Sequence, residues 1–119
     1  MDIYAANIMD HYRRPRNRGR LVNPDYQAEL ANSSCGDIIS VDVKLTDGLV
    51  SDLKFEGQGC AISQAAISIL TERLIGKKPE EIISYDFLEL EKILGIPLSQ
   101  RRQDCAALGL KAIKQALLN

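Results

Sequence analysis

The chain of 119 residues is poor in aromatic side chains: it contains no tryptophan, two phenylalanines and four tyrosines. Proteins that hold single-stranded nucleic acid stack its bases on exposed aromatic rings, so this scarcity excludes stacking as a major binding device. The formal net charge is only −1, which argues against a general binder of nucleic acid or membranes. No apolar run approaches the roughly 20 residues of a membrane-spanning helix. We therefore expect neither nucleic acid nor a membrane as a partner, and the length fits one domain over residues 1–119.

Other chemical devices are missing as well. His11 is the sole histidine, and without a second histidine or a serine constellation, hydrolytic nucleophilic catalysis has little support. We expect its imidazole to be hydrogen-bonded within the fold or exposed. No glycine-rich phosphate-binding loop is present, which argues against a nucleotide site. The first residues have neither the basic nor the apolar stretch of a signal peptide, so we expect a cytoplasmic protein.

Cysteine is scarce too, but each of the three stands in a polar setting: Cys35 lies in Ser-Cys-Gly-Asp, Cys60 follows a glycine, and Cys105 follows Asp104. An odd number of cysteines in a reducing compartment argues against structural disulfides and leaves the thiols reduced, metal-bound or reactive. They lie too far apart in the sequence for a local Cys-x-x-Cys knuckle, so the fold must assemble any shared site. Soft thiolates with a hard carboxylate, supplied by Asp37, suit zinc or the irons of an iron–sulfur cluster.

Simpler explanations exist for the same residues. Cysteine is among the most buried residue types and often only fills a core, and Cys105 precedes an Ala-Ala-Leu run that suits this interpretation. Asp37 can close a turn, and Asp104 can be a solvated carboxylate in the first turn of a helix. The pattern alone leaves both explanations open.

Two segments alternate apolar and polar residues with the period of a β-strand. Residues 38–46 place an apolar side chain at every second position, and after the Asp-Gly dipeptide at 47–48 the apolar set resumes at Leu49, with Val50 on the opposite, polar face. Asp-Gly is a strong signal for a tight hairpin turn. We predict a β-hairpin with one buried face, and a weaker pattern over residues 26–31 favours a third strand.

Helical spacing dominates the remainder. A first helix is predicted over residues 2–12, and apolar positions after Cys60 indicate a second. The predicted caps and ends of the later helices are Gly76, Pro79, Asp86, Gly95 and Ser99. The order of helix, strands and helices predicts an α+β domain, a small three-stranded antiparallel sheet with helices packed on one face.

The thiols occupy special places in this plan. Cys60 falls where the second strand of the hairpin turns into a helix, and Cys105 falls in the first turns of the last helix. The positive end of a helix dipole favours a thiolate. Gly59 permits the backbone angles of a sharp strand-to-helix turn, and Gly36 does the same beside Cys35. We expect exposed, activated sulfur atoms.

The densest charge cluster of the chain runs from Arg13 to Arg20. Like most runs of charge, it is expected to face water. Because the rest of the chain is neutral to acidic, the cluster is also a candidate docking surface for an acidic partner.

Three separated blocks of sequence resemble one known family. The blocks are Asp10-His11-Tyr12 with Pro15-Arg16-Asn17, Cys35-Gly36-Asp37, and Gly59-Cys60-Ala61-Ile62-Ser63. In this order, with a third cysteine in the final helix, they are similar to the IscU/NifU-type iron–sulfur cluster assembly scaffold. The resemblance runs from Ile3 to Leu117 and implies a three-stranded antiparallel sheet against several helices.

The resemblance implies that Cys35, Cys60 and Cys105 are the cluster thiolates, and that Asp37 assists iron or zinc binding and keeps the cluster labile. It implies a [2Fe–2S] cluster built from iron and from sulfur that a cysteine desulfurase passes on as persulfide, with apo iron–sulfur proteins as recipients. Cys105 and Cys35 are the expected first persulfide acceptors, because a thiolate in a mobile or helix-start setting is the better nucleophile. Such a protein is a scaffold rather than an enzyme; a homodimer or higher oligomer stays open.

Two departures from the family pattern concern the ligands and the partners. Asp104 stands where the family has histidine directly before the third cysteine, so the fourth ligand is Asp37, Asp104, water or a partner group. Residues 96–100 replace the Leu-Pro-Pro-Val-Lys stretch that an Hsp70-type chaperone reads, which puts delivery through that chaperone in question.

The surroundings of Cys105, with Arg102 before it and Ala106 after it, are closer to the SufU branch, whose members act as zinc-bound sulfur acceptors for a cysteine desulfurase. SufU proteins usually carry an insertion between the second and third cysteines, and this chain has no room for it. A zinc-dependent sulfurtransferase is therefore the alternative to the scaffold. A metal-free interaction adaptor is the third hypothesis.

Overall fold

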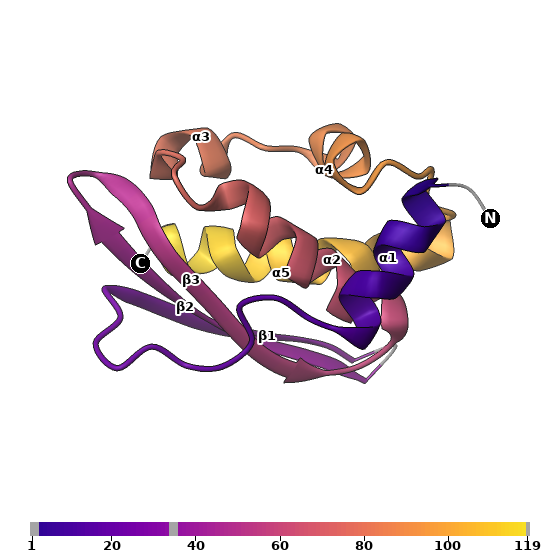
Figure 1. The fold of residues 1–119 in the computed structure, drawn as a ribbon, viewed down its shortest axis with the longest axis horizontal. Coiled ribbons are helices and arrows are strands. Elements are labelled where there is room, and N and C mark those ends of the chain that lie inside the picture. The colour runs from indigo at the N-terminus through magenta and orange to yellow at the C-terminus, as the bar shows by residue number, and fades with distance from the viewer. Residues whose placement is uncertain (1–2, 34–35, 119) are drawn as a thin grey trace.

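The computed structural model describes residues 3–33 and 36–118, which form three strands and five helices (Figure 1). Along the chain these are α1 (Ile3–Arg13), β1 (Tyr26–Asn32), β2 (Asp37–Thr46), β3 (Leu49–Gln58), α2 (Ala61–Leu74), α3 (Pro79–Ile83), α4 (Phe87–Leu94) and α5 (Gln100–Leu118). The α+β prediction is confirmed, although Asp2, the predicted start of the first helix, lies outside the described residues. Within these ranges no helix has the length and apolar character that crossing a membrane requires.

The strands form one antiparallel sheet in the order β1-β2-β3. Val41 of β2 lies opposite Ala28 of β1 on one side and opposite Phe55 of β3 on the other. The predicted hairpin is confirmed, and its turn residues Asp47 and Gly48 have φ angles of 55° and 80°. These are the left-handed angles that a type I′ hairpin turn needs. The strand expected from the weaker pattern is β1.

Two residues at the start of β3 face the opposite way from the prediction. The pairing of β2 with β3 shifts between Lys44 and Leu45: Lys44 lies opposite Asp52, and Leu45 opposite Val50. One extra residue on β3 reverses the alternation beyond that point. Val50 is 1% exposed and Leu49 is 37% exposed. The prediction of Leu49 inward and Val50 outward is therefore wrong, because it assumed an uninterrupted period of two.

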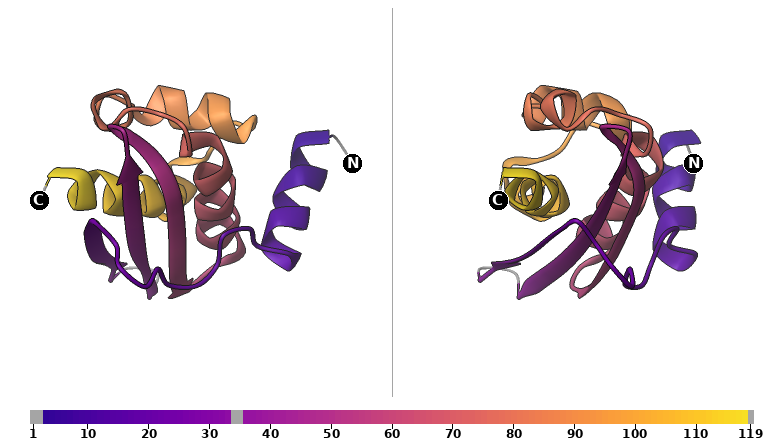
Figure 2. Two further views of the ribbon diagram at one scale, coloured as in Figure 1. Left: turned by 60° about the vertical axis from the view of Figure 1, so that its left-hand side comes forward. Right: turned by 90° about the vertical axis from the view of Figure 1, so that its left-hand side faces the viewer.

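The helices gather on one side of the sheet. α5 packs on β1 and β2, α2 packs on β3 and on α5, and α3 and α4 form a further layer over these two helices (Figure 2). α1 packs mainly on α2, beside the sheet. The fully buried centre combines Ile39 and Phe55 from the sheet with Leu70 and Leu74 from α2. Each such side chain contributes about 1.5–3 kcal/mol by leaving water.

The segment between α1 and β1 runs along the edge of β3. The backbone N–H of Gly19 donates to the carbonyl of Phe55 at 2.8 Å, and the N–H of Phe55 donates to the carbonyl of Asn17 at 3.0 Å. These bonds satisfy backbone groups that an edge strand would otherwise present to solvent. The edge of β3 is therefore covered at Phe55, and Gly76 and Lys77 bond the same strand at Val50.

The same segment buries a carboxylate on the outer face of the sheet. Asp42 belongs to the polar half of the alternating strand, yet only 1% of it is exposed. Its oxygens accept hydrogen bonds from Arg20 Nε at 3.0 Å, Arg20 Nη2 at 2.9 Å, the backbone N–H of Leu21 and Gln27 Nε2. A buried carboxylate requires such partners, and this bidentate ion pair holds the segment onto the sheet.

The arginine run largely faces water, as predicted: Arg13, Arg14, Arg18 and Arg20 are exposed, and Arg16 is half-buried. Three of these side chains also form ion pairs within the fold. Arg20 pairs with the buried Asp42, and Arg16 and Arg14 pair with Asp10 of α1 at 2.5 Å and 3.2 Å. The run therefore joins the fold through some of its charges while it stays accessible to a partner.

His11 is hydrogen-bonded in the fold, as expected, and it is only 4% exposed. Its Nδ1 lies 2.8 Å from Ser68 Oγ of α2, and this hydroxyl also accepts the backbone N–H of Arg16 at 2.8 Å. Its Nε2 lies 3.4 Å from the carboxylate of Glu72. Burial, followed by the charge of Arg16, lowers the pKa of His11 below its usual value despite the opposing effect of Glu72. The imidazole thus fastens α1 to α2.

The predicted helix ends are confirmed at α4 and shifted at α2. Asp86 caps α4 by accepting the N–H of Glu89 at 2.9 Å, and Gly95 ends it in the left-handed conformation with φ 75°. α2 ends at Leu74, two residues before Gly76, so Gly76 follows the cap instead of forming it.

Candidate metal centre

Three predicted ligands come together at the end of the sheet where β2 and α2 begin (Figure 1). Asp37 is the first residue of β2, Cys60 is the N-cap of α2, and Cys105 lies in the second turn of α5. One ligand atom from each, a carboxylate oxygen and two sulfurs, lies within 4.8 Å of the other two. Residues far apart in the sequence thus form one cluster of metal-binding groups.

Asp37 is held by the backbone of the residue it faces. Its Oδ1 accepts the N–H of Cys60 at 2.8 Å, and its Oδ2 lies 3.7 Å from the Cys60 sulfur. The carboxylate is fully buried. One oxygen is therefore fixed by the backbone, and the other is directed at the thiol, where a shared metal ion would lie.

A glycine makes this arrangement possible. Gly59 has φ 156°, and a Cβ atom there would lie 2.0 Å from Asp37 Oδ1. No side chain fits at that distance, so residue 59 must be glycine for the carboxylate to reach the Cys60 backbone. The sequence predicts only the sharp turn at Gly59; the close approach to Asp37 is a second role, which depends on the fold.

Cys60 is exposed and is oriented by the first turn of α2. Its sulfur accepts the N–H of Ser63 at 3.5 Å, and the Ser63 hydroxyl donates to the Cys60 carbonyl at 3.0 Å. The thiol occupies the position of an N-capping side chain. The sulfur thus lies between the Ser63 N–H on one side and the Asp37 carboxylate on the other. Ser63 belongs to the sequence block that resembles the family, but its contacts with Cys60 are evident only in the structure.

Cys105 differs from the exposed sulfur that was expected, because it is only 7% exposed. It lies on the side of α5 that packs into the protein, followed by the buried residues Ala106 and Ala107. Burial agrees with the alternative that this cysteine fills the core. Its sulfur nevertheless belongs to the cluster with Asp37 and Cys60, so packing and ligation are compatible.

Asp104 and Cys35 are the remaining predicted ligands. Asp104 is exposed, lines two surface grooves that it shares with Lys111 of α5, and is not part of the described three-residue cluster. Cys35 lies outside the described residues. It immediately precedes Gly36, which has φ 71° and leads into Asp37.

The donor set can be compared with the size of a metal site. A tetrahedral zinc ion with Zn–S bonds of about 2.3 Å separates its ligand atoms by about 3.8 Å. The three described ligand atoms lie within 4.8 Å of one another, so each pair must approach by at most about 1 Å to bind one zinc ion. Two sulfurs and one carboxylate oxygen match the ligands that zinc and cluster iron accept.

The chain matches the family described as the NifU-like N-terminal domain over residues 3–119. It is 33% identical over 132 aligned residues to the zinc-dependent sulfurtransferase SufU of Bacillus subtilis, covering 97% of this chain and 89% of that protein. It is 45% identical over 82 residues to the iron–sulfur cluster assembly scaffold protein IscU of Thermotoga maritima, covering 69% of this chain and 58% of that protein.

A solved structure agrees with these sequence matches. The crystal structure of a putative SUF-system scaffold protein from Fervidobacterium islandicum AW-1 superposes with a TM-score of 0.80 at 26% identity, covering 98% of this chain and 96% of that chain. The fold and the sequence thus lead to the same assignment: this protein belongs to the NifU-like N-terminal domain family, together with relatives named IscU and SufU.

Proposed function

We propose that this protein is a scaffold on which a [2Fe–2S] cluster is assembled and from which it is transferred to apo iron–sulfur proteins. Cys35, Cys60, Cys105 and Asp37 are the proposed ligands of the cluster. The observation that carries the proposal is the convergence of Asp37, Cys60 and Cys105, whose ligand atoms lie within 4.8 Å of one another.

The mixed ligand set suits a protein that must release what it binds. Thiolates bind cluster iron strongly, whereas a carboxylate is a harder and weaker partner for it. One oxygen of Asp37 is held by the Cys60 N–H, which keeps the carboxylate in place. When the cluster leaves, the other oxygen can resume its contact with the Cys60 thiol. Cys60 is exposed, which gives the thiol of a recipient access to the cluster.

Sulfur arrives by exchange with a persulfide on a cysteine desulfurase. A scaffold thiolate attacks the outer sulfur of the persulfide, a new S–S bond forms, and the desulfurase thiolate leaves. Cys105 and Cys35 are the proposed acceptors. Attack also requires access, and because Cys105 is 7% exposed, α5 must move for Cys105 to accept sulfur. The exposed Cys60 is therefore a third candidate.

A second function is favoured by one relative and by the donor set. The SufU relative that covers 97% of this chain is named a zinc-dependent sulfurtransferase. The described oxygen and sulfur atoms suit a zinc ion, which Cys60, Cys105 and Asp37 would hold together with Cys35. Zinc would supply charge that keeps the thiols deprotonated. In this case the protein accepts persulfide sulfur and passes it on.

Anaerobic reconstitution separates the two functions. The purified protein is incubated with ferrous iron, cysteine and a cysteine desulfurase, and visible absorption, metal content and the mass of each cysteine peptide are measured. A cluster spectrum with two irons per site supports the scaffold. Persulfide uptake with retained zinc and no colour contradicts the scaffold and supports the sulfurtransferase. Neither cluster nor persulfide contradicts both functions.

The exposed arginines are the proposed docking site for the desulfurase. Arg13, Arg14 and Arg18 are exposed, and the side chain of Arg14 is 84% exposed. Tyr12 beside them is 44% exposed. An exposed basic group next to an aromatic ring suits an acidic protein surface.

A further inference from the structure

The crossing of α2 and α5 is unusually close at one glycine. A Cβ atom at Gly109 of α5 would lie 2.8 Å from Ile67 Cδ1 and 2.9 Å from Ile67 Cβ on α2. Carbon atoms in ordinary contact are about 3.5–4.0 Å apart. The backbone of α5 thus lies where any larger residue would push it away from α2. A change of side-chain rotamer cannot relieve the contact with the Cβ atom of Ile67.

Helix formation does not explain this glycine. Gly109 lies in the interior of α5, where glycine is among the poorest helix formers. Four other buried residues of the same helix are alanines, which are also small: Ala106, Ala107, Ala112 and Ala116; Leu108, Leu110 and Ile113 are larger buried residues of α5. An alanine at 109 would favour the helix, so the reason for glycine is the distance to α2.

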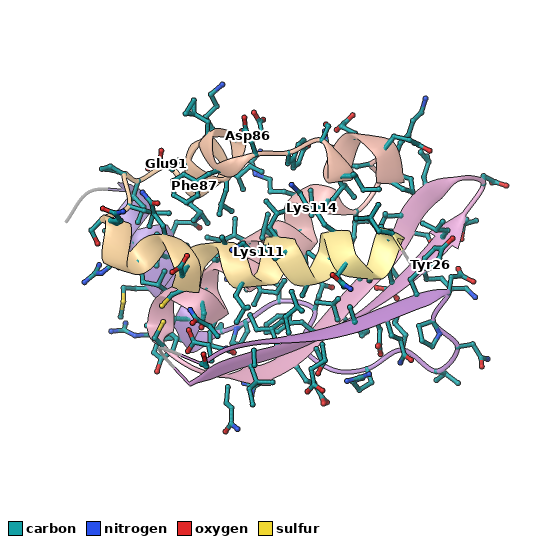
Figure 3. All side chains as sticks on the ribbon, turned by 180° about the vertical axis from the view of Figure 1, so that it is seen from behind. Tyr26, Asp86, Phe87, Glu91, Lys111 and Lys114 are labelled. Atoms are coloured by element: carbon teal, nitrogen blue, oxygen red, sulfur yellow. The ribbon has the colours of Figure 1, made fainter. Side chains whose placement is uncertain are left out.

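The crossing lies next to the candidate metal centre. Gly109 comes four residues after Cys105, one turn further along the same face of α5. Ile67 comes four residues after Ser63, whose N–H bonds the Cys60 sulfur. Figure 3 shows α5 from behind, lying along the helical side of the sheet. The contact therefore joins the part of α5 that carries Cys105 to the part of α2 that orients Cys60.

We infer that Gly109 is a positioning residue, which sets the gap between Cys60 and Cys105 through the close α2–α5 crossing. The inference rests on the proposed function in that these thiols share a metal or cluster. Relieving a 2.8 Å contact moves α5 by about 1 Å. A shift of this size would increase the contraction that the three ligand atoms need in order to meet one metal ion, and would weaken its binding.

The first test measures the gap without any metal. In a Cys35→Ser background only Cys60 and Cys105 remain, and the oxidant diamide cross-links them as a disulfide, for which the two sulfurs must approach to about 2.05 Å. Gly109→Ala is expected to slow cross-linking about tenfold, because the thiols move apart by about 1 Å. Monobromobimane labelling of each thiol controls for reactivity, and Gln115→Ala, at an exposed position of α5, serves as the matched helix variant.

The second test measures binding in the chain with all three cysteines. Zinc affinity, determined by competition with a chelator, is expected to fall about 10- to 100-fold in Gly109→Ala, and the urea midpoint is expected to fall as well, because the added methyl group overpacks the crossing. Ile67→Val removes the nearest atom, Cδ1, and the double variant Ile67→Val/Gly109→Ala is expected to regain part of the cross-linking rate. It also provides a folded form if the single variant fails to fold.

Unchanged cross-linking in Gly109→Ala, compared with Gln115→Ala, would overturn the inference. Because cross-linking needs no metal, its result is independent of the proposed function. A protein that forms no cluster but shows the expected cross-linking series would refute the scaffold function and leave the positioning role intact.

Discussion

Replacing Gly59 by alanine is the most direct perturbation of the Asp37–Cys60 contact. The added Cβ atom would lie 2.0 Å from Asp37 Oδ1 and 2.6 Å from Asp37 Cγ, so the carboxylate must leave its position. Its hydrogen bond to the Cys60 N–H, now 2.8 Å long, is then lost.

The expected cost has two parts. A non-glycine residue at φ 156° adds backbone strain of about 1–3 kcal/mol. A lost hydrogen bond to a buried carboxylate adds about 1.5–3 kcal/mol. We expect Gly59→Ala to lower the free energy of unfolding by about 2.5–6 kcal/mol and the zinc affinity by about 10- to 100-fold.

Gly48→Ala is the matched control. Gly48 also has a positive φ, 80°, but nothing lies within 4 Å of a Cβ atom there, so only strain of about 1–2 kcal/mol applies. Urea unfolding gives the stability of both variants, and chelator competition gives their zinc affinity. Equal losses of stability in the two variants, with zinc affinity unchanged in Gly59→Ala, would refute the reasoning.

Three further predictions follow from the same contacts. Asp37→Asn keeps an oxygen for the Cys60 N–H and should be as stable as the unchanged protein, whereas Asp37→Ala should lower the free energy of unfolding by about 1–3 kcal/mol. Both variants should hold a reconstituted cluster longer during transfer. Complete loss of iron and zinc binding in a folded Asp37→Ala would instead make Asp37 a primary ligand. The fold lowers the pKa of His11 from its ordinary 6.5, so the unfolded chain takes up a proton first and stability should fall as the pH drops below about 6.5. The urea midpoint should therefore decrease with falling pH in the unchanged protein, and this dependence should be lost in His11→Gln. A dependence that persists in His11→Gln would belong to other groups. Replacing Arg13, Arg14 and Arg18 by glutamate should weaken desulfurase binding at least about tenfold at low salt, measured by titration calorimetry, whereas Lys111→Glu on α5 should not; equal affinities would remove the proposed docking site.

Local features of the fold were readable from the sequence, and long-range ones were not. The Asp47-Gly48 turn and the Asp86 cap depend on neighbouring residues, so their signals are short and direct. The burial of Asp42 depends on Arg20 and Leu21, which belong to a segment with no periodic pattern. The apolar–polar alternation of β2 therefore predicted that Asp42 is exposed to solvent, and its partners are evident only in the structure.

The site was predictable in composition and not in geometry. The resemblance supplied Asp37, Cys60 and Cys105 as one group, while their spacing in the sequence could not bring them together. The burial of Cys105 depends on how α5 packs on β1, β2 and α2, which periodicity does not specify. The place of Asp104 outside the described cluster follows from the helix turn, because successive residues on a helix point in different directions.

The covering of β3 by the Asn17–Gly19 segment has a consequence for association. Since β2 is central and the outer edge of β3 is bonded at Val50 and Phe55, β1 is the other edge of the sheet, among the described residues, to which another strand can be added. Residues 26–32 therefore determine whether this protein resists aggregation through its sheet. Glu29, exposed near the middle of β1, places a charge on that edge, and its loss would make strand-to-strand polymerisation easier.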